Sequence, residues 1–192
     1  MKVIKDITKD LVGVSIDTKN LQQRGIADRI EDIVCSQVMK LKSTGLVVEA
    51  ATSKRSIEDI QIKQGLELYK IDIKSHDVNS DFSMPNLVSI DRLRKFYEKD
   101  TNFLVYIFVD YKTVGTTTTI EKIEVRLVEE LDWSILAIQN LGKGQLQIKN
   151  MNSNLVFITP NRAVWMATLK TNAIDYYNKL IQKVERYKKE WI

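Results

Sequence analysis

The sequence predicts a single α/β (α+β) domain in which a central β-sheet is flanked by helices. Apolar residues recur with helical spacing near the start and the end of the chain, and strands with period two lie between them. With 192 residues and 44% hydrophobic content, the chain is long enough to bury one core. It shows no low-complexity linker, so we expect one domain over residues 1–192: a core at about 19–112, a loop with strands at about 116–150 and a closing helix at about 160–191.

The first elements are an amphipathic helix and a strand. Residues from about Lys19 to Lys42 carry isoleucines, valines and a leucine at helical spacing, and Gly45 ends this helix. The run LVVEAAT (46–52) then reads as a strand, and the polar residues 53–56 form a turn.

The next two runs predict a β-hairpin. IEDIQIK (57–63) and LELYKIDIKSH (66–76) both alternate apolar and polar residues, and a glycine separates them. Because successive side chains of a strand point to opposite faces, Asp59 lies on the face opposite its apolar neighbours. Asp72 and Lys74 likewise share the face opposite the isoleucines of their own strand.

The second half of the chain predicts a helix, a central strand, further strands and a closing helix. Residues 86–99 carry apolar side chains in helical register, and FLVYIFVDY (103–111) is apolar enough for a central strand. Residues 116–149 read as strands and turns, interrupted by the polar loop 139–145. The Thr159-Pro160 pair predicts an N-cap and first position for the last helix.

Two aspartates and a lysine on the hairpin form a candidate magnesium-dependent catalytic site. Mg²⁺ takes one or two protein carboxylates and keeps several waters, a role that suits Asp59 and Asp72. Lys74 projects from the face of Asp72, where it can orient or deprotonate a water and offset phosphate charge. The acidic-x-Lys pattern also occurs twice elsewhere. The match at 17–19 precedes the opening helix and does not lie on a strand with an upstream acidic partner, and the match at 110–112 follows the second helix, beyond the expected hairpin. From spacing alone, ordinary solvated strand residues explain the triplet equally well.

Residues 56–93 resemble the active-site region of type II restriction endonucleases of the PD-(D/E)xK superfamily, in the HincII/EcoRV-like branch. The similarity includes the 13-residue separation of Asp59 from Asp72, the Asp-Ile-Lys triplet and the segment Pro-Asn-Leu-Val-Ser at 85–89. Residues 136–149 are more loosely similar to the recognition region of these enzymes. One departure is that Glu58 stands where the superfamily's name has proline, and we expect its side chain to point away from the metal.

The resemblance implies a restriction-endonuclease-like fold with a central mixed β-sheet flanked by helices. It also implies that Asp59, Asp72 and the backbone carbonyl of Ile73 bind Mg²⁺ and that Lys74 is the catalytic lysine. Many members place a further acid of the first helix near the metal, for which Glu31 is the candidate and Asp28 the alternative. For either residue taken individually, an ordinary solvated position on the helix is the favoured explanation.

Polar and basic residues in two loops are candidates for DNA contacts. Amide and ammonium groups suit base edges, and cations before Asp59 suit phosphates; plain turns have the same composition. The candidates are Gln139, Asn140, Lys143, Gln145, Gln147, Lys54 and Arg55. The single histidine, His76, is expected to be a surface residue, and the basic end of the closing helix a solvated face.

Together these features predict a type II site-specific deoxyribonuclease that hydrolyses a short, palindromic DNA site as a homodimer. The alternatives are a structure-specific repair or resolving nuclease of the same superfamily and a non-catalytic DNA-binding module. Cys35 has no second thiol to pair with, and no apolar run is long enough for a membrane span. We therefore expect a cytoplasmic protein of a prokaryotic cell, alongside a possible cognate DNA methyltransferase. The net charge of +4 agrees with a polyanionic partner but is shared by many other proteins.

Overall fold

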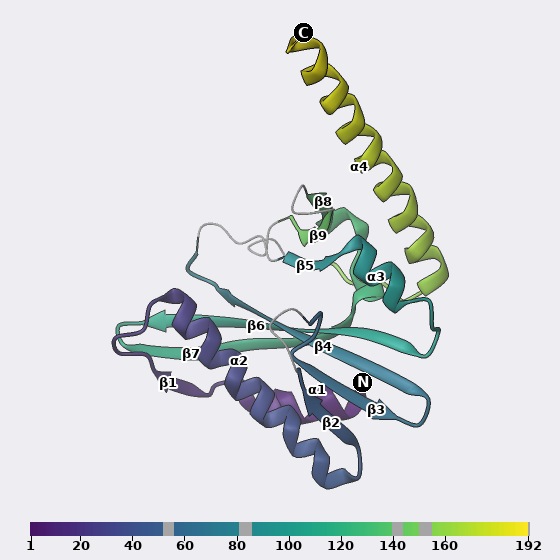
Figure 1. The fold of residues 1–192 in the computed structure, drawn as a ribbon. Helices are drawn as coiled ribbons and strands as arrows, with labels where there is room; N and C mark the ends of the chain where they lie inside the picture. The colour runs from purple at the N-terminus through teal and green to yellow at the C-terminus, as the bar shows by residue number, and fades with distance from the viewer. Residues whose placement is uncertain (52–55, 81–85, 140–143, 150–154, 192) are drawn as a thin grey trace.

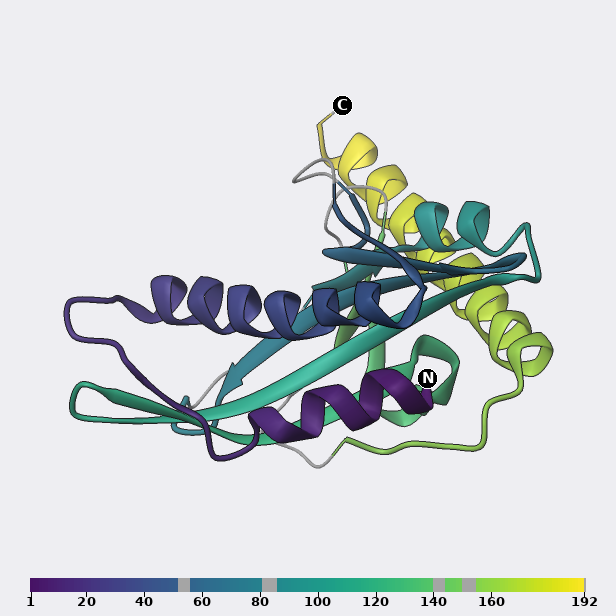
Figure 2. The same cartoon turned by 90° about the horizontal axis from the view of Figure 1, so that it is seen from below.

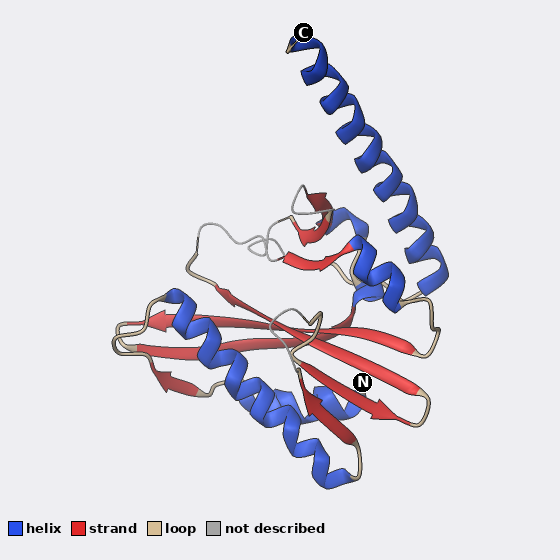
Figure 3. Cartoon of the chain, in the orientation of Figure 1, coloured by secondary structure: helices blue, strands red, loops and turns tan. Residues whose placement is uncertain are grey.

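A computed structural model describes residues 1–51, 56–80, 86–139, 144–149 and 155–191 (Figure 1). The helices are α1 (Lys2–Thr8), α2 (Gln23–Met39), α3 (Ile90–Phe96) and α4 (Arg162–Glu190), with 3-10 turns at Lys9–Leu11, Lys40–Thr44, Val128–Glu130 and Trp133–Ile135. The strands are β1 (Ser15–Asp17), β2 (Val47–Ala50), β3 (Ile60–Gln64), β4 (Glu67–Asp77), β5 (Asn86–Ser89), β6 (Asn102–Val114), β7 (Thr117–Leu127), β8 (Leu136–Gln139) and β9 (Gln145–Ile148). Figure 3 separates the helices from the strands by colour.

The main sheet has the strand order β1-β7-β6-β4-β3-β2. Only β4 and β6 pair in parallel among the described strands of this sheet, and their neighbours pair antiparallel. The apolar strand β6 lies between β4 and β7, so the prediction of a central strand is confirmed. The predicted hairpin is also confirmed: β3 pairs with β4 from Ile60 opposite Ile71, and Gly65 turns between them with φ +60°.

Each face of the sheet has its own hydrophobic core. On one face, isoleucines of β3 and β4 and alternate residues of β6 pack under α1 and α2, with Ile30, Val34 and Val38 of α2 fully buried. Figure 2 shows α2 lying along the length of the sheet. On the other face, Tyr106 and Phe108 of β6 pack with α3, the first half of α4 and the small sheet β5-β9-β8. The prediction of a mixed sheet flanked by helices is confirmed.

Two sequence-based expectations about where helices begin were wrong. Residues 86–89 form strand β5, which pairs with β9, and the helix begins only at Ile90, where the Ser89 hydroxyl accepts the Arg92 N–H. The last helix is capped by Asn161, whose side chain accepts the Val164 N–H at 3.2 Å, instead of by Thr159.

The beginning of the chain differs as well. We expected the Asp17 triplet to precede the first helix outside any strand, but Asp17 lies on β1 and pairs with Thr117 of β7. Helix α1, which local spacing did not predict, packs in the same core as α2. Two strands separate β1 from β4 in the sheet, so the Asp17 triplet remains far from the hairpin acids. No helix within the described part of the chain has the length and apolar character needed to cross a membrane.

Candidate functional site

The candidate site lies where β3 begins and β4 continues past it. The pairing of the two strands starts at Ile60 and Ile71, so Asp59 stands just outside β3 against the next residues of β4. The Asp59 amide donates to the Ile71 carbonyl at 2.8 Å, and its carboxylate accepts the Ile73 N–H at 2.7 Å. Asp59 therefore holds the edge of β4 with its backbone and its side chain together.

Asp72 and Lys74 share one face of β4, as their spacing predicts. The Lys74 ammonium lies 2.7 Å from Asp72 Oδ2, yet this oxygen accepts no hydrogen bond of normal geometry from any described residue. Asp72 is only 8% exposed. Burial raises the pKa of Asp72 to about 7, against the lowering effect of Lys74 and with a further rise from Asp59. Buried carboxylates are costly unless cations offset their charge, and Lys74 supplies one positive charge against the two carboxylates Asp72 and Asp59.

The donor set at this edge fits magnesium. Two carboxylates lie close together here, because the charge of Asp59 raises the pKa of Asp72. In a strand the N–H and C=O of one residue face the same neighbour, so the Ile73 carbonyl faces the edge on which Asp59 lies. No described group of three or more His, Cys, Asp or Glu side chains is placed to hold a metal. A hard cation that keeps most of its waters needs no more than this pair.

Glu31 of α2 lies within the electrostatic field of the site. Burial raises the pKa of Glu31, the charge of Asp59 raises it further, and Lys74 lowers it. One turn later, burial raises the pKa of Cys35 to about 12, with Asp59 and Glu31 adding to the effect. α2 thus places an acid and a thiol near Asp59. Cys35 was not predicted to lie here, although its i+4 spacing from Glu31 places both on one side of the helix.

Two further neighbours of the site are buried polar groups. His76 follows Lys74 on the same face of β4; it is 5% exposed and its Nδ1 lies 3.0 Å from Asp110 Oδ1, so the expectation of a surface histidine was wrong. Tyr106 is the cross-strand neighbour of Asp72 on β6, and its hydroxyl has no hydrogen-bond partner among the described residues. Burial raises the pKa of Tyr106 well above its ordinary value, and Asp72 adds to the rise. Tyr106 was missed because its strand reads simply as apolar core.

Glu58, the residue before Asp59, forms an ion pair of its own. Its carboxylate pairs with Lys70 at 3.0 Å, and Lys70 in turn lies over the Phe96 ring. Because this ion pair is separate from that of Asp72 and Lys74, Glu58 engages a different lysine of the same strand.

The loop between β8 and β9 was predicted to read DNA. Gln139 is exposed and Gln145 half-buried, whereas the buried Gln147 donates its amide to Asn86 of β5. Gln147 therefore links two strands of the small sheet instead of presenting its amide to solvent. Gly144 has φ +98°, and a Cβ there would lie 2.8 Å from Ile90, so glycine is required. Asn140, Lys143, Lys54 and Arg55 lie outside the described residues.

Comparison with known structures supports the fold. The structure of NlaIV restriction endonuclease superposes with a TM-score of 0.55 at 10% sequence identity, over 92% of this chain and 89% of that one. A Holliday junction resolvase, Hjc of Archaeoglobus fulgidus, gives a TM-score of 0.31 at 13% identity, over 59% of this chain and 84% of that one. No protein-family model and no curated protein sequence matches the chain. The chain therefore has a restriction-endonuclease-like fold, on the strength of the first of these two structures.

Proposed function

We propose that the protein is a Mg²⁺-dependent DNA endonuclease of the PD-(D/E)xK type that cuts a short palindromic duplex site. The observation that carries the proposal is the buried Asp72, which has one oxygen without a hydrogen bond and lies beside Asp59 and 2.7 Å from Lys74. The restriction-endonuclease-like fold supports it. The HincII/EcoRV-like branch remains a proposal within this family of folds.

Asp59, Asp72 and the Ile73 carbonyl are the groups proposed to hold the ion. A bound Mg²⁺ would screen the phosphate charge and lower the pKa of an attacking water. Lys74 lies 2.7 Å from Asp72 Oδ2. As an ammonium it would orient the water and offset the charge of the phosphate, whereas as a neutral amine it would accept the proton of the water. Asp59 keeps the edge of β4 in place through the Ile73 N–H. Glu31, on α2, adds negative charge near Asp59.

Base contacts are assigned to the loop after β8, with Gln139 and Gln145 as described candidates and Asn140 and Lys143 beside them. Glutamine and asparagine pair well with adenine, and lysine with guanine. Lys54 and Arg55 are candidates for phosphate contacts before Asp59. Two identical subunits match a twofold DNA site, one active site per strand, so we propose a homodimer. A host cell would then need a methyltransferase to protect its own sites.

Digestion of long linear and plasmid DNA by the purified protein tests the proposal. With Mg²⁺ we expect discrete bands, and sequencing of the ends gives the site and its stagger. Lys74→Ala should slow cleavage about 10²- to 10⁴-fold, the range of general acid and base catalysis. Lys63→Ala is the control, because Lys63 is an exposed lysine of β3 that pairs with Glu49.

The outcomes separate the alternatives. Cleavage of four-way junctions without cleavage of linear duplex would favour a resolving nuclease. DNA binding without cleavage of any of these substrates would favour a non-catalytic module. Full activity of Lys74→Ala would contradict the catalytic assignment.

A further inference from the structure

The C-terminal half of α4 extends away from the rest of the domain (Figure 1). The first half is anchored by Trp165, Leu169 and Ala173, which are buried in the second core. From Ile181 to Trp191 every residue is exposed. A helical segment of this length without tertiary packing is marginal in water, so its stability calls for a packing partner.

One side of this exposed helix is apolar. Ile174, Tyr177, Ile181, Val184 and Trp191 are all exposed, at spacings of three, four, three and seven residues. Ile181 is 59% and Trp191 90% exposed. This is the a/d spacing of a coiled-coil seam, with Lys188 at the one remaining seam position. We call these six residues the α4 seam.

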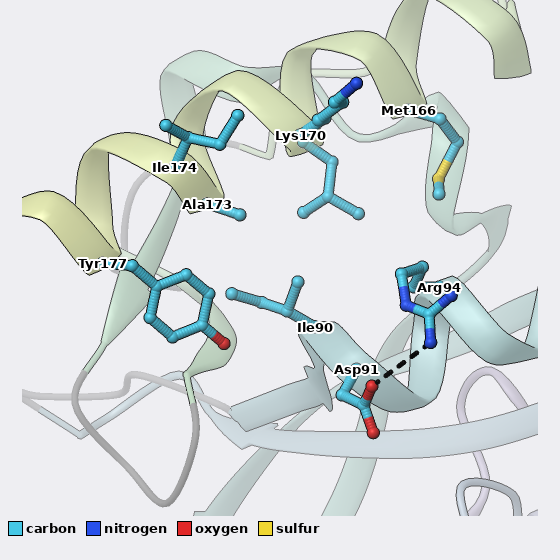
Figure 4. Close-up of a pocket in the computed structure, with 9 residues that line it drawn as sticks. Ile90, Asp91, Arg94, Met166, Lys170, Ala173, Ile174 and Tyr177 are labelled. Carbon is cyan, nitrogen blue, oxygen red and sulfur yellow. Dashed lines mark ion pairs between the residues drawn. The ribbon is translucent and has the colours of Figure 1, made fainter.

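The α4 seam runs into an apolar groove of about 530 Å³ between α3 and α4. Figure 4 shows Ile90 of α3 facing Ala173, Ile174 and Tyr177 of α4 across this groove. Asp91 and Arg94 form an ion pair at its α3 side. Because Ile174 and Tyr177 belong to both features, the groove and the seam form one continuous apolar surface.

We propose that this surface is a twofold interface, on which α4 of a second copy of the chain packs antiparallel. Seam positions then meet in layers: Ile181 against Val184 of the second copy, Ile174 against Trp191 and Tyr177 against Lys188. In every layer the two residue numbers add up to the same total. One twofold axis across the middle of the helix pair therefore relates the residues of all three layers. Trp191 of one copy reaches the groove of the other, and Lys188 lies over a tyrosine ring.

Charge selects the antiparallel direction. Residues 183–190 contain four cations, Lys183, Arg186, Lys188 and Lys189, and two acids. A parallel pair would bring the two cationic ends together and place Lys188 opposite itself in the seam. An antiparallel pair separates the two cationic ends and places each beside residues 175–182, which contain one acid, Asp175, and one base, Lys179. The antiparallel arrangement therefore avoids the like-charge repulsion of the parallel one.

This inference rests on the homodimer of the proposed function and names its surface. The molar mass in solution tests it without any assay of cleavage. The wild type should have twice the chain mass of 22.2 kDa at micromolar concentration, measured by light scattering after gel filtration. The double variant Ile181→Glu/Val184→Glu should have the single-chain mass, because it buries four carboxylates in the seam of a dimer.

The matched control is Lys179→Gln/Arg186→Gln, which changes the net charge by the same amount on the other side of α4. It should remain dimeric. A monomeric wild type, or a dimer that survives the glutamates, would overturn the interface, and in either case the Mg²⁺-dependent cleavage assay still decides the proposed function. If the control variant instead loses affinity for DNA while the wild type is monomeric, the helix is a DNA contact and the dimer proposal fails.

Cross-linking tests the direction of the helices. In a Cys35→Ser background, Ile174→Cys and Trp191→Cys proteins, one of them tagged to change its mass, are mixed, allowed to exchange subunits and oxidised. The antiparallel register should give mainly the mixed cross-link between positions 174 and 191. A parallel pair would give only cross-links between identical variants, and this result would overturn the register.

Discussion

In the metal-free protein, ionised Asp72 should lower the free energy of unfolding, and this loss should grow as the pH rises. Its pKa is raised to about 7 from the usual 3.8, mainly by burial. Between these two values the folded state holds a proton that the unfolded state has lost, so stability falls as pH rises through this window. Roughly three pKa units at 1.36 kcal/mol each give a cost of about 4 kcal/mol above pH 7.

Asp72→Asn removes the charge and keeps the shape, although its amide then needs partners, at about 1–3 kcal/mol. The variant should therefore be about 1–3 kcal/mol more stable than the wild type at pH 8, with the difference vanishing or reversing near pH 5. Urea unfolding in a chelator at pH 5, 6, 7 and 8 measures this. Added Mg²⁺ should stabilise the wild type at pH 8 but leave the variant unchanged, because only binding to the folded state raises stability.

Asp91→Asn is a control of opposite sign. A hydrogen bond from Lys95 lowers the pKa of Asp91 on the surface of α3, so its loss should slightly destabilise the protein at pH 8 and not at low pH. If Asp72→Asn were less stable than the wild type at pH 8, or if the difference did not depend on pH, the account of Asp72 as a buried, poorly compensated charge would be refuted.

Two further substitutions test buried polar groups. Tyr106→Phe removes a hydroxyl without a described partner, so the free energy of unfolding should stay the same or rise by about 1 kcal/mol; a comparable loss in urea unfolding would reveal a partner. Arg162→Ala should destabilise by about 3–5 kcal/mol, because Arg162 pairs at 3.0 Å with the buried Glu129 and its loss leaves that carboxylate without its cation. Adding Glu129→Gln to Arg162→Ala should recover part of the lost free energy of unfolding. If the effects of the two substitutions on this free energy simply added, the pairing of Arg162 with Glu129 would be contradicted.

Local patterns were sufficient for the hairpin but not for elements whose partners lie far along the chain. The alternation in β3 and β4 fixed which residues face α2 and that Asp72 and Lys74 share the other face. The strand β5 was missed because its partner, β9, is about sixty residues away, and its few residues also fit a helical spacing. Similarly, β1 depends on β7, a hundred residues later. Apolar residues that recur every two or every 3.6 residues indicate a strand or a helix. Which strands pair with each other depends on the topology of the whole chain.

The same distinction applies to the site. Spacing predicted which acids and which lysine lie together, and the resemblance suggested Glu31, which the packing of α2 on the sheet places in the field of Asp59. Tyr106 and Cys35 could not be predicted as neighbours of the site. Their positions follow from the β4–β6 register and from the orientation of α2 over the sheet, neither of which has a local signature.

The burial of Asp72 is itself an argument for function that does not depend on resemblance. Its neighbours Ile71 and Ile73 are buried in the core under α2, and Tyr106 lies beside it on the other face, so the strand cannot move to expose the carboxylate without disrupting both cores. An uncharged side chain at this position would satisfy the same packing at a lower free-energy cost. This sequence has a carboxylate at position 72, a second one adjacent and a lysine 2.7 Å away. The arrangement lowers stability at one position of an otherwise consistent fold. Such local conflicts are expected at sites where a ligand completes the structure, and a hard cation is the ligand that two carboxylates and a carbonyl select.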